Sequence, residues 1–275
     1  MLIVFCNRGL AQITHPKISP KSKLIQSVGL TEVSIEYSRP SARGRKVFGN
    51  VVPYGRMWRL GANESSHISF QDSVSILGNK LAPRTYALYA IPEKDEWIVV
   101  FHKNLNLWGD GRDLYDSAED ALRVVLPVSS YNQYVETFTM EMNQLTHDSG
   151  VLEIYWENTI VGVPFVWDIE QKMLDEIEKQ IIQNPSSQTF YEAARYYQEA
   201  NMLPQKALFY LDKAEEIDGA KYFISRIRSL VQASLKNFPE AISEAERSLS
   251  MAESLGKDEF VRMNAENIRK WKTLE

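Results

Sequence analysis

The hydrophobic pattern of this 275-residue chain changes its period once, after Pro164. Before that residue, apolar and polar side chains alternate over short stretches such as 33–37, which is the pattern of a strand with one buried face. After it, apolar residues recur on one helical face, at Ile169, Met173, Leu174, Ile177 and Ile181. The change predicts a strand-rich domain followed by a helical domain.

Short strands are predicted before the change of period, at residues 33–37, 67–70, 74–77, 86–91, 97–101, 122–126, 137–142 and 151–156. No helical pattern separates them, and such spacing is typical of an antiparallel sandwich or an open barrel. Five of the six tryptophans precede residue 168, which also favours strands there, because aromatic side chains fit a pleated surface. We expect a mostly antiparallel β-sandwich over residues 19–165, after a flexible stretch at 1–18.

The helical part, residues 166–275, contains an internal repeat. Residues 205–218 align with residues 239–252 at an offset of 34, the period of tetratricopeptide repeats. The alignment places Ala207 over Ala241, Leu211 over Ala245, and Ala214 over Ser248. Because small residues let two helices approach closely, we expect an all-α, tetratricopeptide-like domain. Since a free-standing array needs about three or more repeats, this domain should pack on the sheet domain or bind a protein partner.

Charge and cysteine content exclude several classes of protein. The net charge is −5; residues 1–165 carry 16 cations and 17 acids, and residues 166–275 carry 15 and 19. Neither part has the basic excess typical of nucleic-acid binding. The single cysteine, Cys6, excludes an internal disulfide and a paired-cysteine metal site. No apolar run reaches the roughly 18 residues that span a membrane, so no transmembrane segment is expected.

The segment from residue 39 to residue 63 is the candidate ligand site. It carries six cations and no acid, and its glycines and prolines predict a loop. Converging arginines bind carboxylate or phosphate groups, and neighbouring aromatic and amide groups suit a polar or anionic small molecule or a glycan. The candidate ligand-binding residues are Arg39, Arg43, Arg45, Tyr54, Arg56, Trp58, Arg59, Asn63 and Glu64.

Simpler interpretations of the same segment stay open. Some of its arginines could pair with Glu36 or Glu64 while the others are solvated. Trp58 could belong to the core rather than to a ligand site. The sequence alone does not decide between these interpretations.

The sequence favours binding over catalysis. Its four histidines lack a close metal-binding spacing, although His67 and His102 could converge with Glu64 from neighbouring strands. Ser65 lies between Glu64 and His67, but adjacent strand residues point to opposite faces, which argues against a serine hydrolase. We expect no cofactor and no metal; residues 108–113 suit a surface turn, with calcium binding as the alternative. The alternatives to a binding protein are a hydrolase of unfamiliar type that uses Glu64 and a structural envelope component.

The segment YSRPSARGRKVFGNVVPYGRMWRLGANESSHISF, residues 37–70, resembles the bacterial family catalogued as domain of unknown function 2911. The resemblance extends from residue 19 through 81–92, 97–103 and 108–109 to 153–156. It implies a mostly β domain that is commonly exported and sometimes followed by helical repeats, and it implies no activity. Where the family usually has PAGTY, this chain has Pro83-Arg84-Thr85-Tyr86, and the lost glycine weakens the expectation of a tight turn.

The N-terminus resembles part of an export leader. Residues 2–6 form a short apolar run, and Ala11 supplies a small residue at which cleavage could occur. The run is shorter than a complete leader and no basic stretch precedes it, so the true start would lie upstream of Met1. A buried or frayed terminus is the alternative. We expect an extracytoplasmic protein, either periplasmic or secreted.

We predict that the mature protein begins near Gln12, because cleavage after a small residue is the rule for such leaders. Expression from an upstream start codon, followed by sequencing of the N-terminus of the exported fraction, measures this directly. An intact Met1 in the cytosolic fraction would contradict the prediction.

Overall fold

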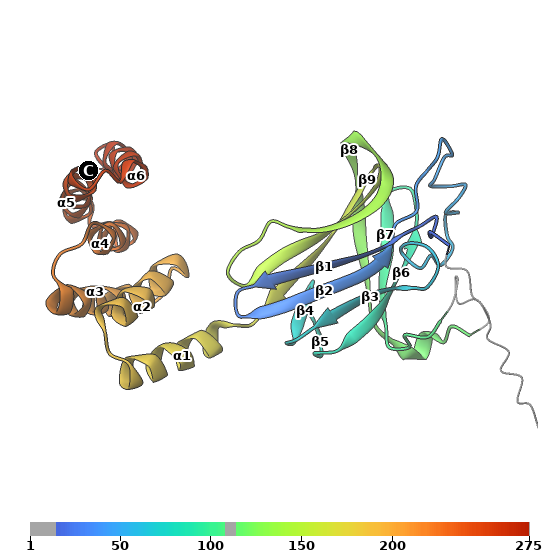
Figure 1. Ribbon diagram of the computed structural model, residues 1–275, viewed down its shortest axis with the longest axis horizontal. Helices are drawn as coiled ribbons and strands as arrows, with labels where there is room; N and C mark the ends of the chain where they lie inside the picture. The colour runs from blue at the N-terminus through green and yellow to red at the C-terminus, as the bar shows by residue number, and fades with distance from the viewer. Residues whose placement is uncertain (1–14, 108–113, 275) are drawn as a thin grey trace, which may run out of the picture. The chain divides into compact units, whose positions relative to one another are not determined.

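The computed structural model of the protein describes residues 15–107 and 114–274 (Figure 1). The leader-like residues 1–14 and the stretch 108–113 lie outside the described residues. The chain divides into two compact units between Ile169 and Glu170. The first unit ends four residues beyond the predicted end at residue 165, because its last strand continues to Trp167.

The first unit is a nine-stranded sheet in the order β1-β2-β3-β6-β7-β8-β9-β4-β5, and its neighbouring strands are antiparallel. The strands are β1 (Lys21–Val28), β2 (Thr31–Ser38), β3 (Ser66–Phe70), β4 (Val74–Ile76), β5 (Asn79–Leu81), β6 (Thr85–Pro92), β7 (Glu96–His102), β8 (Asp120–Asn143) and β9 (Ser149–Trp167). A short 3-10 helix, η1 (Ser117–Glu119), precedes β8.

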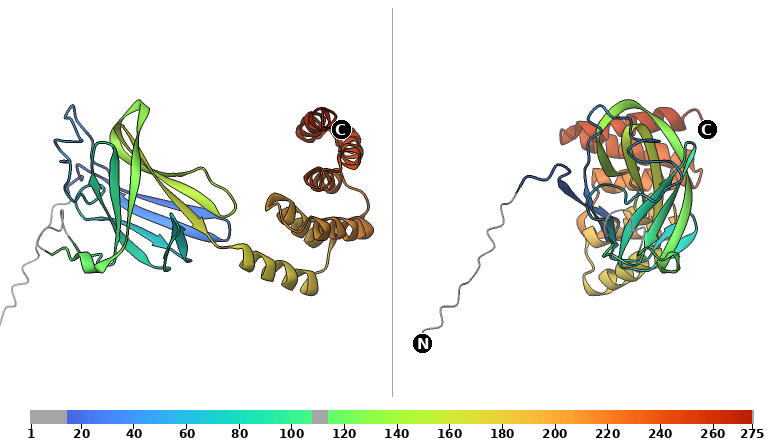
Figure 2. Two further views of the ribbon diagram at one scale, coloured as in Figure 1. Left: turned by 180° about the vertical axis from the view of Figure 1, so that it is seen from behind. Right: turned by 90° about the vertical axis from the view of Figure 1, so that its right-hand side faces the viewer.

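The long strand β8 folds this sheet into a sandwich. Residues 120–127 pair with β7 and residues 128–143 pair with β9, and register shifts between residues 130 and 139 let the strand bend. Figure 2 shows how β8 and β9 curve away from the other strands. The far part of β8 reaches β2, where the Tyr37 hydroxyl donates to the Met140 carbonyl and accepts from the Met140 N–H.

Alternate side chains of the strands fill the interior of the sandwich. On β2 the side chains of Val33, Ile35 and Tyr37 are buried, and on β3 so are those of Ile68 and Phe70. Aromatic rings fill much of the rest. One group, called the aromatic cluster below, consists of Phe48, Trp58, Trp97, Phe138 and Trp156.

The second unit is helical, with six helices among its described residues. They are α1 (Glu170–Gln183), α2 (Ser187–Glu199), α3 (Pro204–Asp218), α4 (Tyr222–Ser234), α5 (Phe238–Ser254) and α6 (Asp258–Trp271). Helices α3 and α5 begin 34 residues apart, and the three aligned residues of each are 0% exposed. Within the described residues, the helices are all too short or too polar to cross a membrane.

The two-part architecture and the positions of the predicted strands are confirmed, with two differences. β8 is one continuous strand where two were predicted, and β1 and β5 were not predicted. β1 lies at the edge of the sheet and exposes Lys21, Lys23 and Ile25, so its sequence carries no clear apolar face.

Trp167→Ala is expected to lower the free energy of unfolding of the first unit by about 3–5 kcal/mol, because the lost indole leaves a cavity. Trp167 is 1% exposed, and its ring lies 5.8 Å from that of Phe165 and 6.4 Å from that of Phe70. Its neighbour Val166 is 47% exposed, so Val166→Ala should cost no more than about 1 kcal/mol. Urea unfolding of residues 15–169, followed by circular dichroism, compares the two variants, and equal costs would contradict this assignment of the core.

Candidate functional site

The candidate loop, residues 39–63, leaves β2 and returns to β3, and it is tied to the sandwich along its length. The Ala42 N–H donates to the Glu136 carbonyl of β8 at 2.8 Å. Trp58 and Ala90 of β6 exchange two backbone hydrogen bonds of 2.7 Å each. The loop is therefore part of the folded domain, held against both layers.

Backbone strain is concentrated in this loop. Arg43, Leu60 and Asn63 have φ values of 54°, 47° and 62°. Such left-handed conformations cost about 1–3 kcal/mol at residues other than glycine, and they persist only where the surroundings hold them. Gly61, with φ of 145°, is packed so closely that a Cβ atom would lie 2.8 Å from the Ser38 carbonyl oxygen. Packing therefore sets the path of the loop.

Trp58 belongs to the core, which was the simpler of the two interpretations of this residue. It is 7% exposed, and its ring stacks on that of Trp156 at a centroid distance of 5.8 Å. It also meets Trp97 and Phe138 edge to face. The indole N–H donates to the Gly61 carbonyl at 3.1 Å. Trp58 thus fastens the loop to the aromatic cluster.

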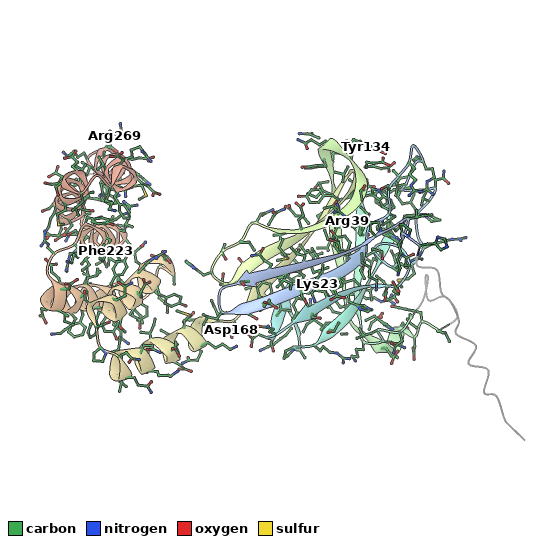
Figure 3. The ribbon with its side chains drawn as sticks, viewed as in Figure 1. Lys23, Arg39, Tyr134, Asp168, Phe223 and Arg269 are labelled. Atoms are coloured by element: carbon green, nitrogen blue, oxygen red, sulfur yellow. The ribbon has the colours of Figure 1, made fainter. Side chains whose placement is uncertain are left out.

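Arg39 is a structural anchor. Its Nε donates to the Phe138 carbonyl at 3.1 Å, and its Nη2 donates to the Thr139 hydroxyl at 2.7 Å (Figure 3). Both acceptors belong to β8, so the guanidinium group ties the end of β2 to the opposite layer. These two contacts give Arg39 a structural role.

Three of the predicted arginines come together in one pocket. Arg43, Arg45 and Arg59 line a pocket of about 530 Å³, and Trp58 and Trp156 also line it. We call it the arginine pocket. Among its described lining residues there is no aspartate or glutamate. The described lining of the pocket is therefore positively charged.

Backbone carbonyls hold two of these guanidinium groups. Arg45 donates from Nε to the Ala42 carbonyl at 2.9 Å and from Nη2 to the Ser41 carbonyl at 3.0 Å. Arg43 donates from Nη2 to the Ile18 carbonyl at 3.3 Å. Within the described part of the chain, no carboxylate lies within 4.0 Å of either guanidinium group. Their positive charges are thus positioned without being neutralised.

The remaining candidates lie outside the arginine pocket. Tyr54 packs over Gly49, where its ring would lie 2.8 Å from an added Cβ atom. Arg56 is exposed to solvent. Glu64 lines a different pocket, described below. Of the predicted site residues, Arg43, Arg45, Trp58 and Arg59 line the arginine pocket.

Comparison with known families identifies the first unit. A family model described as a protein of unknown function, DUF2911, matches residues 19–165, which is more than half of the chain. The chain belongs to the DUF2911 family. No curated protein matches it. The DUF2911 domain is the sheet unit that carries the arginine pocket.

Two carboxylates that the sequence analysis missed hold the loop of the DUF2911 domain. Glu136 of β8 accepts from the Arg43 backbone N–H at 2.6 Å, and Glu157 of β9 accepts from the Val47 N–H at 3.0 Å. These contacts join residues 93 and 110 positions apart in the sequence, so no local signal marks them. Both acids therefore bind backbone N–H groups of the loop.

Glu64 lies at a second pocket of the DUF2911 domain, called the outer-face pocket. It has a volume of about 240 Å³, and Glu36 lines it together with Glu64. Lysines rather than arginines face these acids, with Lys23 2.8 Å from Glu36 and Lys21 3.6 Å from Glu64. The described ion pairs of Glu36 and Glu64 are therefore with lysines and not with the arginines of the loop.

Asn63 lies between the two pockets. Its side-chain amide donates to the Ser19 carbonyl and to the Ser38 hydroxyl, at 3.2 Å each. Ser19 lines the arginine pocket and Ser38 lines the outer-face pocket. Asn63 therefore helps to build the wall between them.

Ser65 and His67 share one face, because they are two residues apart on the strand path. The Ser65 hydroxyl lies 3.4 Å from His67 Nε2, so the alternation of strand side chains does not place these two residues on opposite faces. The same Nε2 lies 3.2 Å from the Leu105 carbonyl oxygen, which can only accept. That contact requires a proton on Nε2. An Nε2 that carries a proton cannot take one from Ser65, which argues against a serine nucleophile.

His102 belongs to a separate, buried network. Its Nδ1 lies 2.9 Å from the Asp120 carboxylate, and its ring stacks on that of Tyr115 at 4.7 Å. Arg123 donates to the same carboxylate at 2.6 Å, and burial raises the pKa of the Tyr115 hydroxyl. Within the described residues, no three potential metal ligands are grouped around a common point. This network ties the segment before β8 to β7.

Proposed function

We propose that the DUF2911 domain binds a small anionic ligand in the arginine pocket. The ligand is a small molecule that carries a carboxylate or phosphate group, or an acidic glycan. One observation carries the proposal: Arg43 and Arg45 line a single pocket, and backbone carbonyls hold both guanidinium groups. Two cations held around one space repel each other, and an anion between them removes that repulsion.

The arrangement of Arg45 supports this proposal. A guanidinium group has five N–H donors, and Arg45 uses two of them on the carbonyls of Ser41 and Ala42. The others remain available to a ligand. Because the two carbonyls already fix the side chain, less conformational entropy is lost when the ligand binds.

The size of the pocket supports a small molecule. Its volume of about 530 Å³ lies within the range of roughly 300–1,000 Å³ typical of ligand sites. Trp58 and Trp156, which also line the pocket, add apolar surface next to the cations. A sugar acid or a phosphorylated metabolite combines the apolar faces and the anionic group that such a lining matches.

The proposal is one of binding without catalysis. A hydrolase that used Glu64 would need a second acid with a separated pKa. Glu36 is a second acid at the same pocket, but the hydrogen bond from Lys23 lowers its pKa. The pKa of Glu64 is lowered by its own backbone N–H, helped by the charge of Lys21. Both carboxyls are therefore ionised at neutral pH, so neither can serve as a general acid.

Arg45→Gln is expected to weaken the binding of glucuronate or inorganic phosphate at least about tenfold, because a charge-assisted hydrogen bond is lost. Isothermal titration calorimetry on the complete chain measures this. Binding by the unsubstituted protein should weaken as chloride rises, because salt screens the guanidinium charges. No binding of either anion, or equal binding by the variant, would contradict the proposal.

Two matched variants separate the ligand role from structural roles. Arg39→Gln should destabilise the domain, because β8 loses two anchoring contacts, but leave anion affinity unchanged. Arg56→Gln removes an exposed cation of the same loop that does not line the pocket, so it should change neither property. Equal weakening by Arg45→Gln and Arg56→Gln would indicate a general charge effect instead of a site.

We also propose that α1 to α6 are degenerate tetratricopeptide-like repeats that bind a protein partner of an exported protein. The equal spacing and burial of the aligned residues in α3 and α5 support the repeat. A groove of about 580 Å³ between α1 and α2 supports partner binding, because Met173, Ile177 and Tyr196 line it with Glu176 and Glu192. Export rests on the leader-like N-terminus and on the resemblance described above.

A photoreactive residue at Gln188, which lines this groove, should crosslink a partner in the source cells. The same residue at Glu253, which is exposed on α5 and lies outside the groove, serves as the control and should not. Equal crosslinking at the two positions, or none at Gln188, would contradict partner binding through this groove.

A further inference from the structure

The outer-face pocket contains groups that anion binding does not use. Strand register places one row of residues across five strands, Lys23, Glu36, His67, Ala87 and His102. Figure 3 labels Lys23 on β1, where this row begins. The segment 105–107 packs on the same face, and it contributes Leu105 and Leu107 to the pocket. The pocket therefore combines an apolar side with a polar one.

Two carboxylates, Glu36 and Glu64, line this pocket together with Lys21, and their lysine partners hold them weakly. The lysine side chains are more than half exposed, at 59% for Lys21 and 54% for Lys23. Such exposed pairs contribute little to stability, so a ligand can replace them. Glu64 Oε2 is a buried atom without a hydrogen bond in the described structure, since Lys21 Nζ lies 3.6 Å away. This oxygen can accept a hydrogen bond from a ligand.

The interior side of the pocket carries hydroxyl groups. Ser65 lines the pocket and is 5% exposed. Tyr89, which is fully buried, lies beside Ser65. Ser38 adds a further hydroxyl at the wall shared with Asn63. The pocket thus offers carboxylate and hydroxyl oxygens from several directions.

These groups fit an ammonium ion better than an anion or a metal ion. An anion would be repelled by Glu36 and Glu64, both of which line the pocket. A metal ion would need several close ligands, and no such group of side chains exists among the described residues. An ammonium group donates three hydrogen bonds, which matches two carboxylates and a hydroxyl. Leu105 and Leu107 can cover the carbon atoms attached to it.

We propose that the outer-face pocket binds the primary ammonium group of a small organic amine. Glu64 and Glu36 accept two of its N–H bonds, and a serine hydroxyl accepts the third. The ligand amine displaces Lys21, which already lies at that carboxylate. This site has the opposite charge to the arginine pocket and lies across the wall built by Asn63. It does not depend on the anion site.

The test compares probes that differ in one group. Glucosamine carries a primary amine where glucose has a hydroxyl and N-acetylglucosamine has an amide, and putrescine is an amine without a sugar ring. Isothermal titration calorimetry of the complete chain at neutral pH should detect glucosamine and putrescine at millimolar concentrations. Glucose and N-acetylglucosamine should not bind. Saturation-transfer NMR should report that putrescine displaces glucosamine from the unsubstituted protein.

Substitutions of the lining carboxylates test whether the amine binds in this pocket. Glu64→Gln and Glu36→Gln should each weaken glucosamine binding at least about tenfold, because each loses a charged acceptor. Glu32→Gln removes an acid from the same strand that does not line the pocket, and it should leave the affinity unchanged. Arg45→Gln should also leave it unchanged, which distinguishes this site from the arginine pocket.

Three results would overturn the proposal. Equal binding of glucose and glucosamine would show that hydroxyl groups rather than the ammonium are recognised. Unchanged affinity in both Glu64→Gln and Glu36→Gln would place the amine elsewhere. Absence of amine binding to the unsubstituted protein in both measurements would remove the site, whatever the variants do.

Discussion

The packing of Trp58 into the aromatic cluster is the constraint on which the rest of the DUF2911 domain depends. The loop supplies Phe48 and Trp58, and Trp97, Phe138 and Trp156 come from β7, β8 and β9. A buried ring removes about 150–250 Å² from water, which corresponds to about 4–6 kcal/mol at 25 cal/mol per Å². That exceeds the roughly 1–3 kcal/mol of strain at each left-handed residue of the loop. Burial therefore determines where the arginines are held.

The charges of the domain are arranged so that its pockets keep opposite signs. Glu136 and Glu157 bind backbone N–H groups of the loop, and backbone carbonyls hold the side chains of Arg43 and Arg45. Glu36 and Glu64 face exposed lysines, which hold them weakly. Asn63, a neutral residue in a left-handed conformation, builds the wall between the two sites. Because Asn63 separates the two pockets, the charged residues of one pocket do not neutralise those of the other.

The cationic loop could be recognised from sequence, but the roles of its residues could not. Arg39 and Arg45 look alike in a one-dimensional pattern. Arg39 meets β8 acceptors about a hundred residues away, whereas Arg45 bonds carbonyls three and four residues before it and turns to the pocket. The alternation of adjacent strand residues argued against a shared site for Ser65 and His67, yet their two-residue spacing puts them on one face. Glu36 became the second acid of a pocket only through its pairing with β3.

Hydrophobic periodicity by itself determined the division into a strand-rich and a helical unit and most strand positions, and the internal alignment determined the 34-residue spacing of α3 and α5. These features are local, because the period of side-chain burial follows from the geometry of the backbone. Only the tertiary structure decided that β8 is one bent strand, that β1 closes the edge of the sheet, and which arginines share a pocket. Those outcomes depend on strand register and on contacts between residues far apart in the chain. A local sequence pattern does not specify which distant group lies beside a given side chain.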